Sequence, residues 1–129
     1  MITRDPVNMA KILMIDDDAA QRAILQRFLS PLAYEVLEAG GGAEALELAR
    51  ARRPDIVLLD IYMPGKNGVE VLKELAPEMP KTGFIMITGN EDEEVARDCL
   101  KFGAFDYISK PIDLHTLEKT IKARLLLQE

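Results

Sequence analysis

A short apolar run that ends in a carboxylate and a Pro-Gly turn, at residues 55–65, constrains the fold more than any other feature of the chain. Residues 56–59 are Ile-Val-Leu-Leu, Asp60 follows them, and Pro64-Gly65 forms the turn. Continuous β-favouring residues predict a strand that is buried on both faces, as in a parallel sheet covered by helices. Asp60 would then end this strand at the sheet edge where open α/β folds bind ligands. A simpler interpretation is that Asp60 only caps the turn.

The same unit, a short apolar run followed by an amphipathic helical pattern, recurs along the chain. Strands are predicted at residues 11–15, 34–38, 56–60, 83–87 and 105–108. The helices are indicated by apolar residues at helical spacing, namely Ile24, Leu25, Phe28 and Leu29; Ala45, Leu46 and Ala49; Val69, Leu72 and Leu75; Val95, Ala96, Cys99 and Leu100; and Leu114, Leu117, Ile121 and Leu125. Five strands that alternate with five helices predict a doubly wound five-stranded parallel sheet, a flavodoxin-like (βα)5 fold with strand order 2-1-3-4-5.

Several polar residues are assigned only to helix ends and turns. Asp18, with Gln21 three residues later, fits a helix cap with its reciprocal partner, and Asp113 fits the cap of the last helix. The glycines at 40–42 have neither of the usual phosphate-loop spacings and are predicted to form a turn. The acids at 91–94 favour a helix N-terminus through the helix dipole, and no chemistry is assigned to them.

Length, charge and cysteine content limit the classes of protein that fit. A chain of 129 residues with 48% apolar and 29% charged residues has the size and balance of one globular domain. We expect residues 11–127 to form it, after a frayed or disordered lead at 1–10. The net charge of -6 argues against direct contact with nucleic acid. The single cysteine, Cys99, excludes an intramolecular disulfide and fits a reducing cytoplasm, and no apolar run is long enough to cross a membrane.

Polar residues follow four of the predicted strands. In the order 2-1-3-4-5, the carboxyl ends of strands 1 and 3 flank the point where the strand order reverses, with strands 4 and 5 beside them. The side chains of five residues are therefore expected to converge there: Asp16, Asp17, Asp60, Thr88 and Lys110.

The chemistry of this set can be inferred from its residue types. Carboxylates that are packed together repel one another unless protons or a cation neutralise them, and Mg²⁺ prefers such oxygen ligands. A carboxylate such as Asp60 can also act as a nucleophile towards a phosphoryl group, provided that nearby donors match the phosphoryl charge. Lys110 and Thr88 would provide such donors. Taken singly, Lys110 fits an ordinary surface lysine and Thr88 a strand-end hydroxyl bonded to its own backbone.

Four segments of the chain resemble the motifs of one known family. Residues Ile15 to Asp18 resemble its acidic pair, and residues Leu59 to Gly65 resemble its phosphorylation-site motif. Residues Ile87 to Gly89 resemble its hydroxyl position, and Lys110-Pro111 its lysine-proline pair. On these motifs the chain from Lys11 to Leu127 is similar to the receiver domain of two-component response regulators, the CheY-like family.

The resemblance implies a phosphorelay function. Asp60 would accept a phosphoryl group from a phosphohistidine on a sensor histidine kinase or a histidine phosphotransfer protein, with Thr88 and Lys110 as its catalytic neighbours. No stand-alone enzyme activity is implied beyond Mg²⁺-dependent self-phosphorylation from a donor and autodephosphorylation. The chain would be either a stand-alone receiver or the N-terminal part of a longer regulator.

The resemblance also implies a metal site. Mg²⁺ would be held by Asp16 or Asp17, by Asp60 and by the backbone carbonyl of Tyr62. In the predicted topology, the side chains of Tyr62 and Asn90 would hang over the mouth of the site, where an attacking water must approach the phosphoryl group in line. We therefore expect these two residues to set the dephosphorylation rate.

A conformational switch is a further implication of the resemblance. Tyr107 falls at the family's switch aromatic, and we expect it to turn inward when Thr88 moves towards the phosphoryl group. An alternative is that Tyr107 simply packs on the core. The face formed by the fourth helix, fifth strand and fifth helix, including Phe102, would then engage an output domain, a partner protein or a second copy in a phosphorylation-dependent dimer.

Two other classes of function share some of these features. A phosphatase of the haloacid-dehalogenase type also uses an aspartyl nucleophile in an α/β fold, but it needs Asp-x-Asp after its first strand and usually a cap domain. We expect this chain to lack the length for a cap domain, because one domain accounts for it. A receiver-shaped interaction module that takes no phosphoryl group is the second alternative. The presence of Asp60, Thr88 and Lys110 argues against that module.

Overall fold

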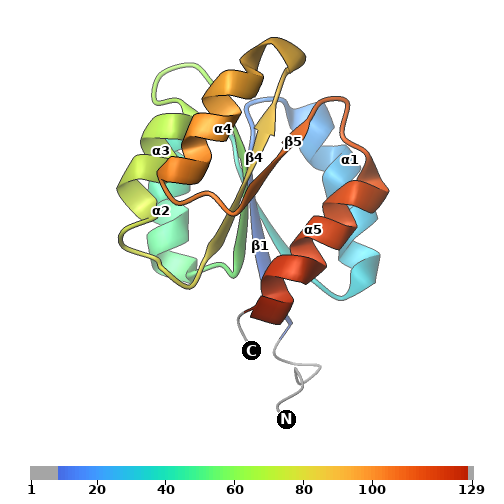
Figure 1. Ribbon diagram of the computed structural model, residues 1–129. Coiled ribbons are helices and arrows are strands. Elements are labelled where there is room, and N and C mark those ends of the chain that lie inside the picture. Colours follow the sequence, from blue (N-terminus) through green and yellow to red (C-terminus); the bar gives the residue numbers. More distant parts are fainter. Residues whose placement is uncertain (1–8, 128–129) are drawn as a thin grey trace.

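The computed structural model describes residues 9–127, apart from the side chain of Asn90, and contains a five-stranded parallel sheet between two layers of helices (Figure 1). The strands are β1 (Lys11–Ile15), β2 (Glu35–Ala39), β3 (Ile56–Asp60), β4 (Gly83–Thr88) and β5 (Asp106–Ser109). The α-helices are α1 (Ala19–Leu29), α2 (Gly42–Arg52), α3 (Gly68–Leu75), α4 (Glu93–Lys101) and α5 (Leu114–Leu127), and two 3-10 turns are η1 (Ser30–Leu32) and η2 (Asn90–Asp92). The strand order is β2-β1-β3-β4-β5, which confirms the predicted fold and topology.

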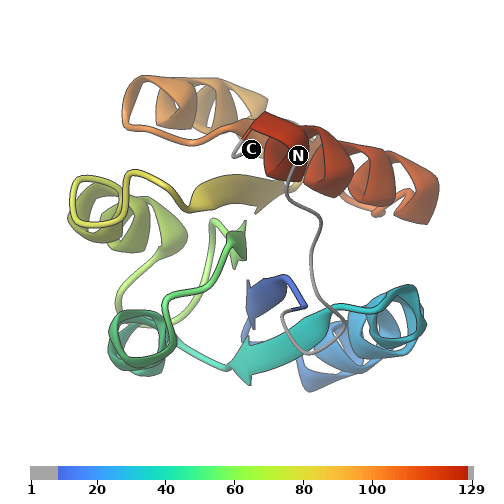
Figure 2. The same cartoon turned by 90° about the horizontal axis from the view of Figure 1, so that it is seen from below.

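The central strand β3 is buried along its whole length, as its unbroken apolar run predicts. It pairs with β1 on one side and with β4 on the other. Helices α2, α3 and α4 cover one face of the sheet, and α1 and α5 cover the other (Figure 2). Because successive side chains of a strand point to opposite faces, Val57 and Leu59 join the core under α2–α4, whereas Ile56 and Leu58 join the core under α1 and α5.

The helix faces differ from the sequence prediction at three positions. Ile24 is 52% exposed and Leu100 is 42% exposed, so their assignment to buried stripes was wrong. In α3, Val71 is fully buried, whereas the predicted Val69 is only partly buried. The reason is geometric, because each helical residue is rotated by about 100° from the last and only a narrow stripe of each helix faces the sheet. Cys99 is buried as predicted, and burial raises the pKa of its thiol.

Two helix caps form as predicted, but one reciprocal bond does not. The carboxylate of Asp18 accepts the amide hydrogen of Ala20 at 2.9 Å, and Asp113 caps α5 in the same way. The predicted return bond from Gln21 is wrong, because the amide of Asp18 donates to Oδ1 of Asp16 at 2.9 Å. The Asp16 carboxylate therefore also fixes the start of α1.

Element boundaries differ from the prediction by one or two residues. Strands β2 and β5 each begin one residue later than predicted, and η2 precedes α4 where a continuous helix was expected from residue 91. The predicted lead falls mainly on residues 1–8, which lie outside the described residues, and Ala10 is buried with its carbonyl bonded to the amide of Glu35. Within residues 9–127, no helix is long and apolar enough to cross a membrane.

Candidate acidic site at the carboxyl edge of the sheet

Three carboxylates meet where β1 and β3 end side by side. Asp16 follows β1 directly and Asp60 ends β3, and the strand register pairs Ile15 with Leu59. One carboxylate oxygen from each of Asp16, Asp17 and Asp60 lies within 4.8 Å of the other two. Asp16 and Asp60 are buried, whereas Asp17 is exposed. The cluster therefore has a buried floor and one side that solvent can reach.

Electrostatic repulsion in this cluster is only partly relieved. Burial, reinforced by the Asp16 carboxylate, raises the pKa of Asp60 to about 6, and Lys110 opposes part of the rise. Nζ of Lys110 lies 3.4 Å from Oδ1 of Asp60. One lysine thus does not offset the cost of burying a carboxylate beside other carboxylates. Three carboxylate oxygens whose negative charge is only partly neutralised fit a hard divalent cation such as Mg²⁺.

Lys110 and Thr88 reach this edge from the ends of β5 and β4. The backbone amide of Lys110 donates to the carbonyl oxygen of Thr88 at 2.7 Å, and the peptide bond from Lys110 to Pro111 is cis. Thr88 is buried, and its hydroxyl donates to the carbonyl oxygen of Gly89 at 3.1 Å. The hydroxyl is therefore bonded to its own local backbone, as the simpler interpretation of Thr88 expects.

Two tyrosines flank the segment between β4 and α4. Tyr62 is exposed, and the negative charge of the neighbouring Asp92 carboxylate raises the pKa of the Tyr62 hydroxyl. Tyr107 is half-buried in β5, and its hydroxyl donates to Oε1 of Glu93 at 3.4 Å. The sequence indicates only a helix start for Asp92 and Glu93, because both tyrosines lie far from these acids along the chain.

Asn90 and Phe102 lie before and after helix α4 in the chain. The side chain of Asn90 lies outside the described part of the structure, so its predicted place over the mouth is not described. The Phe102 ring lies 4.3 Å from Nζ of Lys73, which belongs to α3. Phe102 therefore borders α3 and lies at the edge of the predicted α4-β5-α5 face.

Two residues that the sequence did not single out support the acidic site. Nη1 of Arg22 donates to the backbone carbonyl of Asp16 at 2.5 Å, and its Nε pairs with Glu38 at 3.0 Å. A Cβ on Gly68 would lie 2.2 Å from the backbone oxygen of Asp60, so only glycine permits this approach of α3 to β3. Neither contact has a signal in the sequence, because each joins separate segments.

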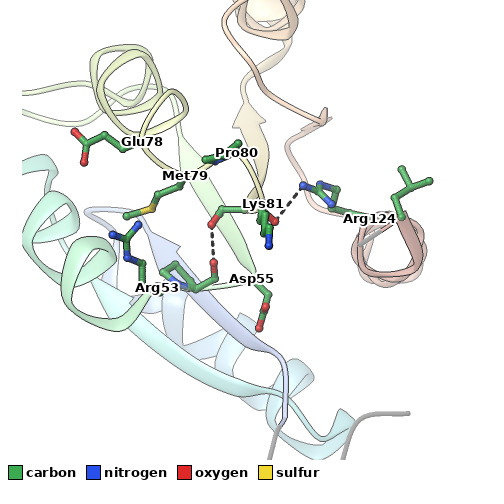
Figure 3. A pocket seen from close by; sticks show the side chains of 10 residues that line it. Arg53, Asp55, Glu78, Met79, Pro80, Lys81 and Arg124 are labelled. Atoms are coloured by element: carbon green, nitrogen blue, oxygen red, sulfur yellow. Dashed lines mark hydrogen bonds between the residues drawn. The ribbon is translucent and has the colours of Figure 1, made fainter. Parts of the chain in front are cut away.

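A hollow of about 690 Å³ lies at the opposite, amino-terminal edge of the sheet (Figure 3). Its lining includes Arg53, Met79, Lys81 and Arg124, and a nitrogen of Arg124 donates to the carbonyl of Lys81 at 3.1 Å. None of the predicted site residues lines this hollow. The acidic site is thus located by its converging charges and not by the size of a cavity.

Fold and site together define a class of protein: a doubly wound α/β domain that gathers carboxylates and a lysine where its strand order reverses. The family model for the response regulator receiver domain matches residues 12–122. The chain therefore belongs to the response regulator receiver domain family.

Relatives of known sequence and structure agree with this assignment. The chain is 38% identical to Protein PilH of Pseudomonas aeruginosa over 119 residues, which cover 91% of the chain and 98% of PilH. It is 36% identical to Regulatory protein AtoC of Escherichia coli, of which it spans only 26%. A receiver domain protein from Clostridium thermocellum superimposes with a TM-score of 0.89 at 30% identity, over 93% of this chain and 97% of that one. The chain thus matches both a protein of similar length and a much longer regulator.

Proposed function

We propose that this domain is a phosphoacceptor in which Asp60 takes a phosphoryl group from a phosphohistidine on a sensor histidine kinase or a histidine phosphotransfer protein. The observation that carries the proposal is the contact between Lys110 and a buried Asp60 inside a cluster of carboxylates. A carboxylate oxygen of Asp60 would form a bond to phosphorus while the bond from phosphorus to the imidazole nitrogen breaks. The electron pair of the broken bond stays on the nitrogen, which takes up a proton.

Asp16, Asp17 and Asp60 would hold Mg²⁺, with the backbone carbonyl of Tyr62 as a further oxygen ligand. When bound, the ion supplies positive charge against the carboxylates and the phosphoryl oxygens. Lys110 places a second positive charge beside the acceptor oxygen.

A switch that follows phosphorylation is the next part of the proposal. Thr88 would exchange its bond to the Gly89 carbonyl for one to a phosphoryl oxygen, and Tyr107 would turn inward. The α4-β5-α5 face would then bind an output domain, a partner protein or a second copy of the chain. Amide chemical shifts should move on this face as well as at the acidic site. Shifts confined to the acidic site would contradict the switch.

Two relatives whose names describe regulatory proteins, AtoC and the transcriptional regulatory protein ZraR, extend well beyond the region matched by this chain. We therefore propose that the output is carried by another domain or by a separate partner. A cytoplasmic location fits, because a thiol such as Cys99 stays reduced there.

Acetyl phosphate in the presence of Mg²⁺ tests the phosphoacceptor function directly. Intact-protein mass spectrometry should show one added phosphoryl group on the wild-type chain and none on Asp60→Asn. Asp17→Ala should need more Mg²⁺ for the same labelling. Asp98→Asn removes an exposed carboxylate elsewhere and should label as the wild type does. A wild-type chain that gains no phosphoryl mass would favour the receiver-shaped interaction module without phosphorylation.

A further inference from the structure

Asp92, the acidic residue directly before α4, does not cap this helix with its side chain. It occupies the N-cap position of α4, where an aspartate ordinarily accepts backbone amide hydrogens, but its carboxylate makes no such bond. Its Oδ2 is instead turned back over Gly89, 3.4 Å from the place that a Cβ on this glycine would occupy. From there the negative charge of Asp92 acts on the Tyr62 hydroxyl and raises its pKa. The carboxylate therefore places a charge of the β4–α4 segment beside the tyrosine of the β3–α3 loop.

The second acid, Glu93, contacts the other tyrosine. The Tyr107 hydroxyl donates to Oε1 of Glu93 at 3.4 Å, close to the upper limit for a hydrogen bond. Glu93 is exposed, so water competes for this contact, whereas the Tyr107 ring packs against the core under α2–α4. The contact thus holds Tyr107 by its outer end and can be released at low cost.

Both contacts, which we call the α4 tethers, act on the segment directly behind Thr88. The amide of Asp92 donates to the carbonyl of Gly89 at 3.1 Å, which makes residues 89–92 one compact turn. The Gly89 carbonyl is also the present acceptor of the Thr88 hydroxyl. Any change of partner by Thr88 therefore acts first on Gly89, and through this turn on Asp92.

We propose that Asp92 and Glu93 are positioning residues, which hold the β4–α4 segment and Thr88 in the unphosphorylated arrangement. Glu93 acts through its bond to the Tyr107 hydroxyl, and Asp92 acts from its place over Gly89 and beside Tyr62. This inference rests on the proposed phosphoacceptor function, because it concerns the balance between the two arrangements of that switch. Loss of one hydrogen bond that is made only in the resting arrangement should raise the population of the switched arrangement about twofold to tenfold.

The two tethers should differ in one respect. Asp92 lies beside Tyr62, which we expect to screen the phosphoryl group from water, so Asp92→Ala should also shorten the phosphoryl half-life. Of the two tyrosines, Glu93 bonds to Tyr107, so Glu93→Ala should change the switch population with little change in that half-life. This difference separates the positioning role of each acid from a general loosening of α4.

The chain offers a direct probe, because it has three tyrosines and no tryptophan. Incorporation of 3-fluorotyrosine gives one ¹⁹F NMR signal each for Tyr34, Tyr62 and Tyr107, and each signal is assigned with its Tyr→Phe variant. Tyr34 packs against the other core, under α1 and α5, and reports whether a variant is folded. In the unphosphorylated protein, Glu93→Ala should move the Tyr107 signal, Asp92→Ala should move the Tyr62 signal, and neither should move that of Tyr34.

Two matched variants control for charge. Glu94→Ala removes the same charge from the next residue, which is also exposed, and should leave the Tyr62 and Tyr107 signals in place. Glu93→Gln keeps an acceptor oxygen at the same reach and should retain the wild-type Tyr107 signal. The proposal is overturned if Glu93→Ala and Glu94→Ala give the same spectrum, or if Glu93→Gln behaves as Glu93→Ala does.

The tethers and the phosphoacceptor function can fail separately. If acetyl phosphate does not label the wild-type chain, the proposed function is wrong, and the resting-state spectra still decide whether the tethers exist. If the wild type labels, its phosphorylated spectrum defines the switched position of the Tyr107 signal. The Tyr107 signal of unphosphorylated Glu93→Ala should then lie closer to that position than the wild-type signal does. A shift in the opposite direction would overturn the positioning role.

Discussion

Nζ of Lys110 lies 3.4 Å from Oδ1 of Asp60, although 50 residues separate the two in the chain. The lysine side chain is 39% exposed and the aspartate side chain only 8% exposed, so water screens the cation but hardly solvates the anion. Their attraction consequently offsets only part of the cost of burying Asp60 beside Asp16. This imbalance leaves the site ready to take up a proton or a divalent cation.

The buried charge of Asp60 should make the fold less stable at neutral pH. Its pKa rises from 3.8 to about 6 on folding, so the cost is absent below the unfolded value, grows as the pH rises and is complete above about 6. Asp60→Asn removes the charge at nearly constant shape. In Mg²⁺-free buffer at about pH 7.5, it should raise the free energy of unfolding by up to about 3 kcal/mol. Urea unfolding at that pH and at about pH 4 should show that the gain shrinks below about 1 kcal/mol at the lower pH. An equal gain at the two pH values would contradict the raised pKa of Asp60.

Removal of the Lys110 charge should slow phosphoryl transfer. Lys110→Ala takes away the positive charge beside Oδ1 of Asp60 and should lower the labelling rate with acetyl phosphate by about 100-fold. Because Lys110 opposes the rise in the Asp60 pKa, the half-maximal pH of labelling should also move upward. Lys119→Ala removes an exposed charge from α5 and serves as the control. Wild-type labelling by Lys110→Ala would show that Lys110 has no catalytic role.

A methyl group at position 68 should disturb the acceptor strand. The Cβ of Gly68→Ala would lie 2.2 Å from the backbone oxygen of Asp60, so α3 must move away from the end of β3. We expect a loss of about 2–4 kcal/mol in the free energy of unfolding, together with slower labelling. Gly41→Ala is the matched control, because no atom lies within 4 Å of its added Cβ. Comparable losses in the two variants would mean that the close approach is not what matters at Gly68.

The lifetime of the phosphoryl group should depend on Tyr62. Its exposed ring is expected to screen the path of the hydrolytic water, so Tyr62→Ala should shorten the phosphoryl half-life. A change of about 1.4 kcal/mol in the barrier alters the rate tenfold, so loss of one ring is enough to matter. Asn90→Ala should leave the half-life equal or longer. The decay of the phosphorylated mass after donor removal measures both, and a longer half-life in Tyr62→Ala would make Tyr62 a partner-contact residue instead.

Much of the fold was determined by local sequence pattern. The unbroken run Ile56 to Leu59 can be satisfied only by burial on both faces, and its alternation with helical patterns implies parallel strands joined by crossovers. The strand order then brings the ends of β1 and β3 together. For this reason Asp16, Asp17 and Asp60 could be predicted as neighbours from the sequence alone. Their roles as metal ligands and acceptor stay predictions.

Other features depended on contacts between segments that are distant in the sequence. The rotation of α1 about its axis decides that Leu25 is buried and Ile24 exposed, and this rotation is set by packing on the sheet. The partners of Arg22, Asp92 and Glu93 likewise belong to other elements, and no local pattern encodes them. The sequence by itself thus determined which residues reach the acidic edge, because strand ends and hydrophobic periods are local properties. Only the tertiary structure decided the pKa of Asp60 and the hydrogen bond of Tyr107, because burial and hydrogen-bond partners arise from the packing of separate elements.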